Sequence, residues 1–174
     1  AQMCIGGAAV TDFESAFARY TGAQHAIGCS SGTSALWLAL RALNLQPNSI
    51  VLTTPFSFIA SASEIYEHGA HPVFIDTDPA THNLCPQALS TWLEQHTTQE
   101  NGQTIESSTG YPVVGMIIVN IFGMAADFTE FNTLKKQYDL WIVEDAAQSI
   151  GARHNGHTSG TLGDISTFSF YPTK

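Results

Sequence analysis

Residues 113–119 read VVGMIIV, an apolar run that no charged or polar side chain interrupts. A strand that is buried on both faces has such a continuous run, whereas a half-exposed strand alternates apolar and polar residues. A second buried strand is expected at residues 140–143, after a stretch with helical spacing. Two buried strands joined by a helix are typical of a parallel sheet, so this part of the chain predicts an α/β fold.

The alternation of strand and helix continues on both sides of this region. Toward the N-terminus we predict strands at residues 50–53 and 72–75, with a helix between them over residues 57–68 that Gly69 closes. Toward the C-terminus, residues 165–170 predict a further strand. The fold class expected from this order is α/β: a doubly wound, mostly parallel sheet with helices on both faces.

Local signals suggest four more features. Residues 11–14 have the pattern of a capping box at a helix start, and residues 25–29 predict a short strand. Residues 97–112 are polar and have no clear period, so we expect a surface loop there. Asp127, followed three residues later by Glu130, predicts the start of another helix.

Composition limits the possible functions. The chain has 174 residues, enough for one domain with a sizeable core, and a formal net charge of −9. Nucleic-acid binding needs a basic surface, so no nucleic-acid partner is expected. No apolar run approaches the length of a membrane span, so no membrane partner is expected either. We expect a cytoplasmic protein whose Cys4, Cys29 and Cys85 are reduced thiols.

Small polar residues follow the first predicted strand, at the edge where open parallel sheets bind ligands. Gly32, Thr33 and Ser34 lie between residues 25–29 and an apolar helix expected over residues 35–43. Backbone N–H groups at a helix start, together with two hydroxyls, can bind a phosphate, although simple N-capping by serine is an alternative. The motif is neither a Walker loop nor G-x-G-x-x-G, which disfavours a nucleoside triphosphate or a dinucleotide.

Three other side chains could complete a cofactor site. Asp145 directly follows a buried strand, where a carboxylate is costly unless a cation meets it, although it could simply cap the next helix. Phe58 could stack on a planar ring or pack in the core. Lys174 could form a Schiff base with a carbonyl or lie in solvent. A phosphate cradle, a ring platform, a buried carboxylate and an amine are together what pyridoxal 5'-phosphate requires, so the sequence predicts this cofactor.

Five motifs, in order along nearly the whole chain, resemble those of the DegT/StrS-type nucleotide-sugar aminotransferases, which are fold type I enzymes that use pyridoxal phosphate. The motifs are SSGTSAL at residues 30–36, FSF at 56–58, PVFID at 72–76, EDAAQ at 144–148 and FSFYPTK at 168–174.

The resemblance implies a role for each matching residue. Lys174 would form the Schiff base, Asp145 would pair with the ring nitrogen, and Phe58 would stack on the ring. Gln148 would lie near the hydroxyl edge of the ring. The phosphate would be bound at Gly32, Thr33, Ser34 and Ser169.

The resemblance also implies the reaction and its partners. An amino acid, by family resemblance glutamate, would give its amino group to a nucleotide-linked keto-sugar in two half-reactions with ping-pong kinetics. The product would serve amino-sugar and polysaccharide biosynthesis. Both substrates would bind to a homodimer whose subunits share their active sites.

The chain departs from the family pattern in three respects. Residues 97–112 are longer than is usual in the family, and Asn120 stands where a histidine is common. Family members also continue beyond the Schiff-base lysine for about as many residues again. We therefore expect residues 1–174 to be the cofactor-binding large domain, incomplete, without the small C-terminal domain.

Three alternatives stay open. A related class uses pyridoxamine phosphate to dehydrate sugars, but it carries histidine in place of the lysine, so Lys174 disfavours it. The chain could also be a catalytically incomplete α/β fragment that acts only as a binding module. A metal site is the third option, because two histidine pairs have two-residue gaps, but we expect none, since the pairs lack an evident third ligand. These pairs are His68 with His71 and His154 with His157.

Overall fold

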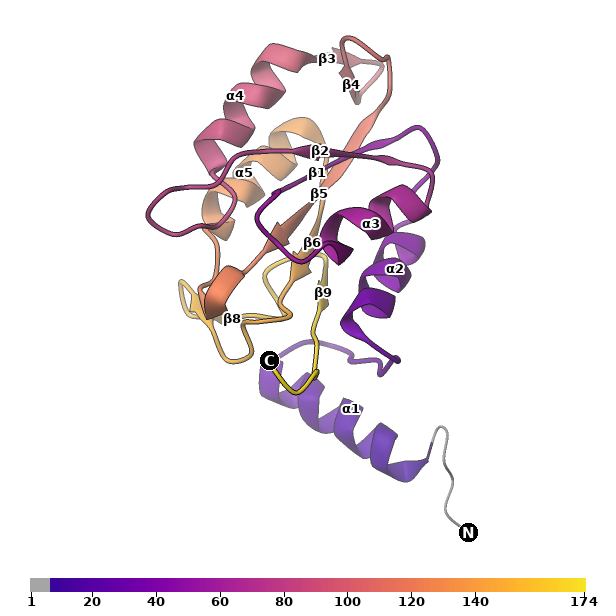
Figure 1. Ribbon diagram of the computed structural model, residues 1–174, viewed down its shortest axis with the longest axis vertical. Coiled ribbons are helices and arrows are strands. Elements are labelled where there is room, and N and C mark those ends of the chain that lie inside the picture. The colour runs from indigo at the N-terminus through magenta and orange to yellow at the C-terminus, as the bar shows by residue number, and fades with distance from the viewer. Residues whose placement is uncertain (1–6) are drawn as a thin grey trace.

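The computed structural model describes residues 7–174, so Cys4 lies outside the described residues. Its centre is a five-stranded sheet in the order β2-β1-β5-β6-β9, and every neighbouring pair in this sheet is parallel (Figure 1). The parallel sheet expected from the sequence is confirmed. Its strands are β1 (Ile50–Thr53), β2 (His71–Phe74), β5 (Val113–Val119), β6 (Trp141–Asp145) and β9 (Ile165–Thr167).

Helices cover both faces of the sheet, as predicted. Figure 1 shows α2 (Gly32–Ala42) and α3 (Ala60–Glu67) on one side, and α4 (Pro86–His96) and α5 (Phe128–Tyr138) on the other. Successive residues of β5 alternate between two cores because strand side chains point to opposite faces. The α2–α3 core includes Leu40, Val51, Ile65, Ile117 and Val143, and the α4–α5 core includes Leu52, Leu89, Met116, Phe131 and Ile142.

The register of the strands sets the position of the site. Val119 at the end of β5 pairs with Asp145 at the end of β6, and Asp145 pairs with Thr167 at the end of β9. The carboxyl ends of three neighbouring strands therefore lie at one edge of the sheet, where ligands of such folds bind.

Helix α1 (Ala8–Thr21) lies at the end of the molecule where the described chain also ends (Figure 1). It packs through aromatic contacts: the ring centroids of Phe17 lie 4.9 Å from Phe168 and 5.4 Å from Phe170. The predicted capping box at residues 11–14 is wrong, because the helix begins earlier, after Gly7. The carboxylate of Glu14 instead accepts a hydrogen bond from the Gly28 N–H at 2.6 Å.

Two predicted elements differ in kind. Residues 25–29 form no strand; the segment runs between α1 and α2, and the Gly28 N–H bonds to a side chain instead of a neighbouring strand. Residues 97–112 are no loop, because they contain an antiparallel hairpin of β3 (Thr97–Glu100) and β4 (Gln103–Glu106). Its turn is Asn101-Gly102, and both residues have the positive φ that two-residue hairpin turns require.

Several element boundaries also differ. Strands β2 and β6 are shifted by one or two residues from the predicted 72–75 and 140–143. Helix α2 starts three residues early because Ser31 caps it, and α3 starts only at Ala60, after a bend at residues 55–57 and Phe58. Strand β9 ends at Thr167 because the next residues turn toward α1. The short remaining elements are η1 (Ile121–Gly123), β7 (Arg153–His154) and β8 (His157–Thr158).

The predicted start of α5 is confirmed, since the Asp127 carboxylate accepts a hydrogen bond from the Thr129 N–H at 3.1 Å. Between residues 7 and 174, none of the helices combines the length and the apolar character that crossing a membrane requires.

Candidate active site

A pocket lies at the carboxyl ends of β5 and β6. Four of the residues that the sequence singled out line it together: Phe58, Asp145, Gln148 and Lys174. They come from the loop after β1, the end of β6, the segment after β6 and the segment after β9. The parallel sheet brings them together because each follows a strand that ends at the same edge.

Asp145 is the buried acid of this pocket. It is only 5% exposed, and it has two hydrogen-bond donors in the structure. The Ser61 hydroxyl of α3 donates to Oδ2 at 2.8 Å, and the Ala147 N–H donates to Oδ1 at 3.2 Å. Burial raises the pKa of Asp145; the two hydrogen bonds and the Lys174 charge oppose this rise without cancelling it. The site therefore favours a proton or a cation next to this carboxyl.

The start of α2 lies beside Ser169, and these are the two segments for which the sequence predicts a phosphate cradle. Ser31 is the cap, and its hydroxyl accepts a hydrogen bond from the Ser34 N–H at 3.0 Å. The first turn of this 11-residue helix carries no acidic side chain. A Cβ atom at Gly32 would lie 3.0 Å from the Cβ of Ser169, so glycine permits the close approach of the two segments. N–H groups and hydroxyls thus converge where an anion could bind.

Comparison with known proteins identifies the family. The family model of the DegT/DnrJ/EryC1/StrS aminotransferase family matches residues 1–174. The chain belongs to this family.

Two curated relatives and a solved structure illustrate the match. The chain is 37% identical over 165 residues to a pleiotropic regulatory protein of Geobacillus stearothermophilus, covering 95% of this chain and 40% of that protein. It is 34% identical over 168 residues to a UDP-2-acetamido-2-deoxy-3-oxo-D-glucuronate aminotransferase of Pseudomonas aeruginosa, covering 97% of this chain and 42% of that protein. A DegT DnrJ EryC1 StrS aminotransferase from Brucella abortus superimposes with a TM-score of 0.89 at 32% identity, over 98% of this chain and 43% of that one.

The chain therefore spans about two-fifths of the length of these proteins: 40%, 42% and 43%, respectively. The fold type I sheet is common to this chain and its structural neighbours.

Phe58 and Gln148, the predicted ring platform and polar contact, both line the pocket. The Phe58 side chain is 69% exposed, so it is not a core residue. The Gln148 Oε1 accepts a hydrogen bond from the Phe122 N–H at 2.9 Å, which leaves its amide N–H groups available as donors. Phe122 has a φ of 54°, an unfavourable value for an aromatic residue, and such strain is often found at functional sites.

Lys174 lines the pocket, and its side chain is exposed. Its backbone N–H donates to the Tyr171 carbonyl at 2.8 Å, which closes a turn over Pro172 and Thr173. Its charge lies near enough to Asp145 to act on that carboxyl.

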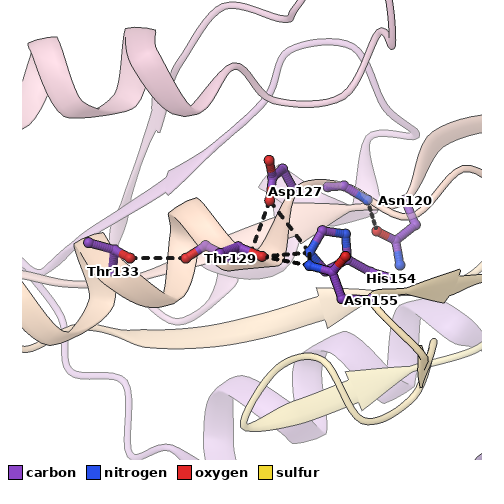
Figure 2. Close-up of polar contacts among 7 residues, drawn as sticks. Asn120, Asp127, Thr129, Thr133, His154 and Asn155 are labelled. Atoms are coloured by element: carbon purple, nitrogen blue, oxygen red, sulfur yellow. Dashed lines mark hydrogen bonds and ion pairs between the residues drawn. The ribbon is translucent and has the colours of Figure 1, made fainter.

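Sequence reasoning missed one hydrogen-bond partner of this site, Ser61, and it noted Asn120 only as a departure from the family pattern. Ser61 is the hydroxyl partner of Asp145, and its only sequence signal is its spacing of four residues from Ser57, with which it hydrogen-bonds at 2.9 Å. Asn120, where the DegT family commonly has a histidine, is fully buried and lies outside the pocket lining. Its amide donates to Glu144. Its side-chain carbonyl, which Figure 2 shows with its hydrogen bond, accepts from the Ala126 N–H at 3.0 Å.

No metal cluster accompanies this site: within residues 7–174, no three His, Cys, Asp or Glu side chains gather as a metal site would require. One of the four candidate histidines, His154, already has other partners. Its Nε2 lies 2.9 Å from the Thr129 hydroxyl and 3.5 Å from the Asp127 carboxylate (Figure 2).

Proposed function

We propose that this chain is the cofactor-binding part of a pyridoxal-phosphate-dependent aminotransferase. The enzyme would transfer an amino group from an amino acid, by family resemblance glutamate, to a nucleotide-linked keto-sugar. One observation carries the proposal: the buried carboxyl of Asp145 and the amine of Lys174 line the same pocket. The nucleotide sugar is suggested by the Pseudomonas aeruginosa relative, whose name states such a substrate.

The residues present fit this cofactor. Pyridoxal phosphate, when bound, supplies an electron sink for the bonds of the substrate α-carbon. The N–H groups of Gly32 and Thr33 and the hydroxyls of Thr33, Ser34 and Ser169 would bind its phosphate. Phe58 would hold one face of the ring, and the Gln148 amide would donate to its hydroxyl edge.

Two residues would carry the chemistry. Lys174 would supply the amine that anchors the cofactor covalently and, once released, would move a proton at the substrate α-carbon as a general acid–base group. Asp145 would hold the proton on the ring nitrogen, because a buried carboxyl with few donors pairs well with a cation. The exclusion of water from Asp145 strengthens this pairing.

The proposal extends to the assembly and its surroundings. A homodimer with shared sites, acting in the cytoplasm in amino-sugar and polysaccharide biosynthesis, is what family resemblance implies. Sedimentation of the purified protein, at concentrations above and below its working range, tests the dimer directly.

The first test is the variant Lys174→Ala. We expect it to lose both the visible absorbance of lysine-bound cofactor and all transamination of a nucleotide keto-sugar. Lys136→Ala is the matched control, because Lys136 is an exposed lysine on α5. Lys135 is a poorer control, since it forms an ion pair with Asp164. If Lys174→Ala retains turnover, the lysine does not have this role.

A further inference from the structure

A second carboxylate is buried directly beside the candidate acid. Glu144 precedes Asp145 in β6 and is fully buried, with 0% exposure. Neighbouring strand residues point to opposite faces of the sheet. Accordingly, Asp145 bonds to Ser61 of α3, while the partners of Glu144 lie on other segments.

The carboxylate of Glu144 accepts hydrogen bonds from five groups. None of them requires a proton on the carboxyl, so the contacts suit the ionised form. Such complete pairing offsets the cost of burying a charge. The donors are the Ser166 hydroxyl at 2.6 Å, the Ser159 hydroxyl at 2.7 Å, the Asn120 amide at 2.9 Å, the Gly160 N–H at 3.0 Å and the Leu162 N–H at 3.1 Å.

These donors come from segments on both sides of β6. Asn120 follows β5, Ser166 belongs to β9, and residues 159–162 form the loop before β9. The Asn120 N–H also donates to the Asp145 carbonyl at 3.0 Å. Glu144 thus fixes the end of β6 between its two neighbouring strands, and it fixes Asp145 with it.

The two neighbouring carboxyls differ in their number of hydrogen-bond donors and in their exposure to the pocket. Glu144 has five donors, whereas Asp145 has two and faces the pocket. When two titratable groups lie in such unequal surroundings, they take different roles. We propose that Glu144 is a positioning residue that, through its buried charge and its hydrogen bonds, makes Asp145 the acceptor for a cationic ring nitrogen. Only the identity of this cation rests on the proposed function.

The charges around Asp145 agree with these separate roles of Glu144 and Asp145. Burial raises the pKa of Asp145, and the charge of Glu144 acts in the same direction. The hydrogen bonds from Ser61 and Ala147 lower it, as does the charge of Lys174. Glu144 and Lys174 are the charged groups that act on Asp145.

The test follows Asp145 in the protein without cofactor. Carboxyl-carbon NMR of protein labelled at the aspartate side chains gives the titration midpoint, and Asp145→Asn identifies the resonance. In Glu144→Gln we expect this midpoint to fall, because a nearby negative charge is lost. An unchanged midpoint in a folded Glu144→Gln protein overturns the inference.

Glu106→Gln is the matched control. Glu106 is also buried and accepts from two hydroxyls and two backbone N–H groups, those of Ser108 and Thr109, but it lies by the β3–β4 hairpin at the other end of the sheet. We expect the Asp145 midpoint to be unchanged in this variant. A similar fall in both variants would mean that a general loosening of the fold, and not Glu144 itself, sets the midpoint, and would overturn the inference.

A second variant keeps the test decisive if Glu144→Gln does not fold. Ser166→Ala removes one donor that offsets the charge of Glu144, so the Asp145 midpoint should rise. Ser108→Ala, which removes a donor from Glu106, should leave it unchanged. An unchanged midpoint in Ser166→Ala counts against the inference. Because no cofactor is present, these outcomes do not depend on whether pyridoxal phosphate binds.

Discussion

Among single residues, Asp145 carries an electrostatic cost that a ligand could relieve. Its carboxyl is removed from water by its position at the end of β6, yet only Ser61 and Ala147 donate to it. Burial therefore raises its pKa above the ordinary value of 3.8. Because the folded state holds the proton more tightly, the protonated carboxyl favours folding fully at pH values below 3.8. This contribution to the free energy of unfolding is lost as the pH rises through the folded-state pKa.

This gives a prediction for Asp145→Asn without cofactor. At about pH 7 the variant should unfold at a higher urea concentration than the wild type, because it buries no charge. The difference should shrink as the pH falls toward about 3, where the wild-type carboxyl is neutral in both states. With cofactor, transamination should fall at least about a hundredfold. A wild type that is the more stable of the two near neutral pH would contradict the electrostatic cost.

The sequence predicted side chains that share a pocket where a residue lies at or beyond the end of a predicted strand. Asp145 and Lys174 met in one pocket because the parallel sheet aligns the ends of β6 and β9. Ser61 and Glu144 were missed because their importance depends on partners far along the chain. A hydrogen bond between residues 61 and 145, for example, leaves no local pattern.

At the scale of elements, the pairing of β5 with β6 requires a residue without a side chain, glycine, at position 115. Gly115 pairs with Trp141, and a Cβ atom at Gly115 would lie 2.1 Å from the indole carbon Cδ2. The apolar run of residues 113–119 predicted β5 correctly, but it gave no reason for its glycine. The reason is the indole ring that lies across the strand.

Gly115→Ala should therefore lower the free energy of unfolding by about 1–3 kcal/mol, because a packed core tolerates added volume poorly. Urea unfolding measures this change. Adding Trp141→Leu should recover part of the loss, since the smaller side chain leaves room for the new methyl group. Strictly additive effects of the two substitutions would show that the clash is relieved by other movements.

The elements that the sequence misjudged share one physical cause. Strand-like residues need a neighbouring strand, and residues 25–29 have none. Polar residues form a hairpin where an Asn-Gly turn brings them together, as Asn101-Gly102 does. The periodicity of apolar residues does not show whether a segment has a neighbouring strand to pair with. It therefore predicted the buried strands well and these exposed segments poorly.

On the scale of the whole molecule, the candidate pocket lies at the carboxyl ends of β5 and β6. The β3–β4 hairpin lies at the opposite end of the sheet (Figure 1). Glu106 stabilises the hairpin end. The Thr109 hydroxyl is the main cause that lowers the pKa of Glu106 to about 2; burial opposes it, and donors on Ser108 add to it. A lowered folded-state pKa means that this stabilisation is present above the unfolded value of 4.5 and is lost as the pH falls toward about 2.

Glu106→Gln should accordingly be less stable than the wild type at neutral pH, and the difference should narrow as the pH falls from 4.5 to about 2. Urea unfolding at several pH values checks this. Affinity for pyridoxal phosphate, measured by absorbance at neutral pH, should stay within about twofold, because the hairpin does not touch the pocket. A large loss of affinity would mean that the two ends of the sheet are coupled.

The packing of α1 against the last described segment has a mechanical consequence. Ser169 and Lys174 lie on one stretch of seven residues, from 168 to 174, whose Phe168 and Phe170 rings are clasped by Phe17. The Ser169 hydroxyl and the Lys174 amine, which we propose bind the phosphate and the aldehyde of the cofactor, thus belong to one short segment. A shift of α1 would move Ser169 and Lys174 together, because Phe17 packs against the segment that carries both. A ligand bound by these two side chains would therefore respond to a movement of α1.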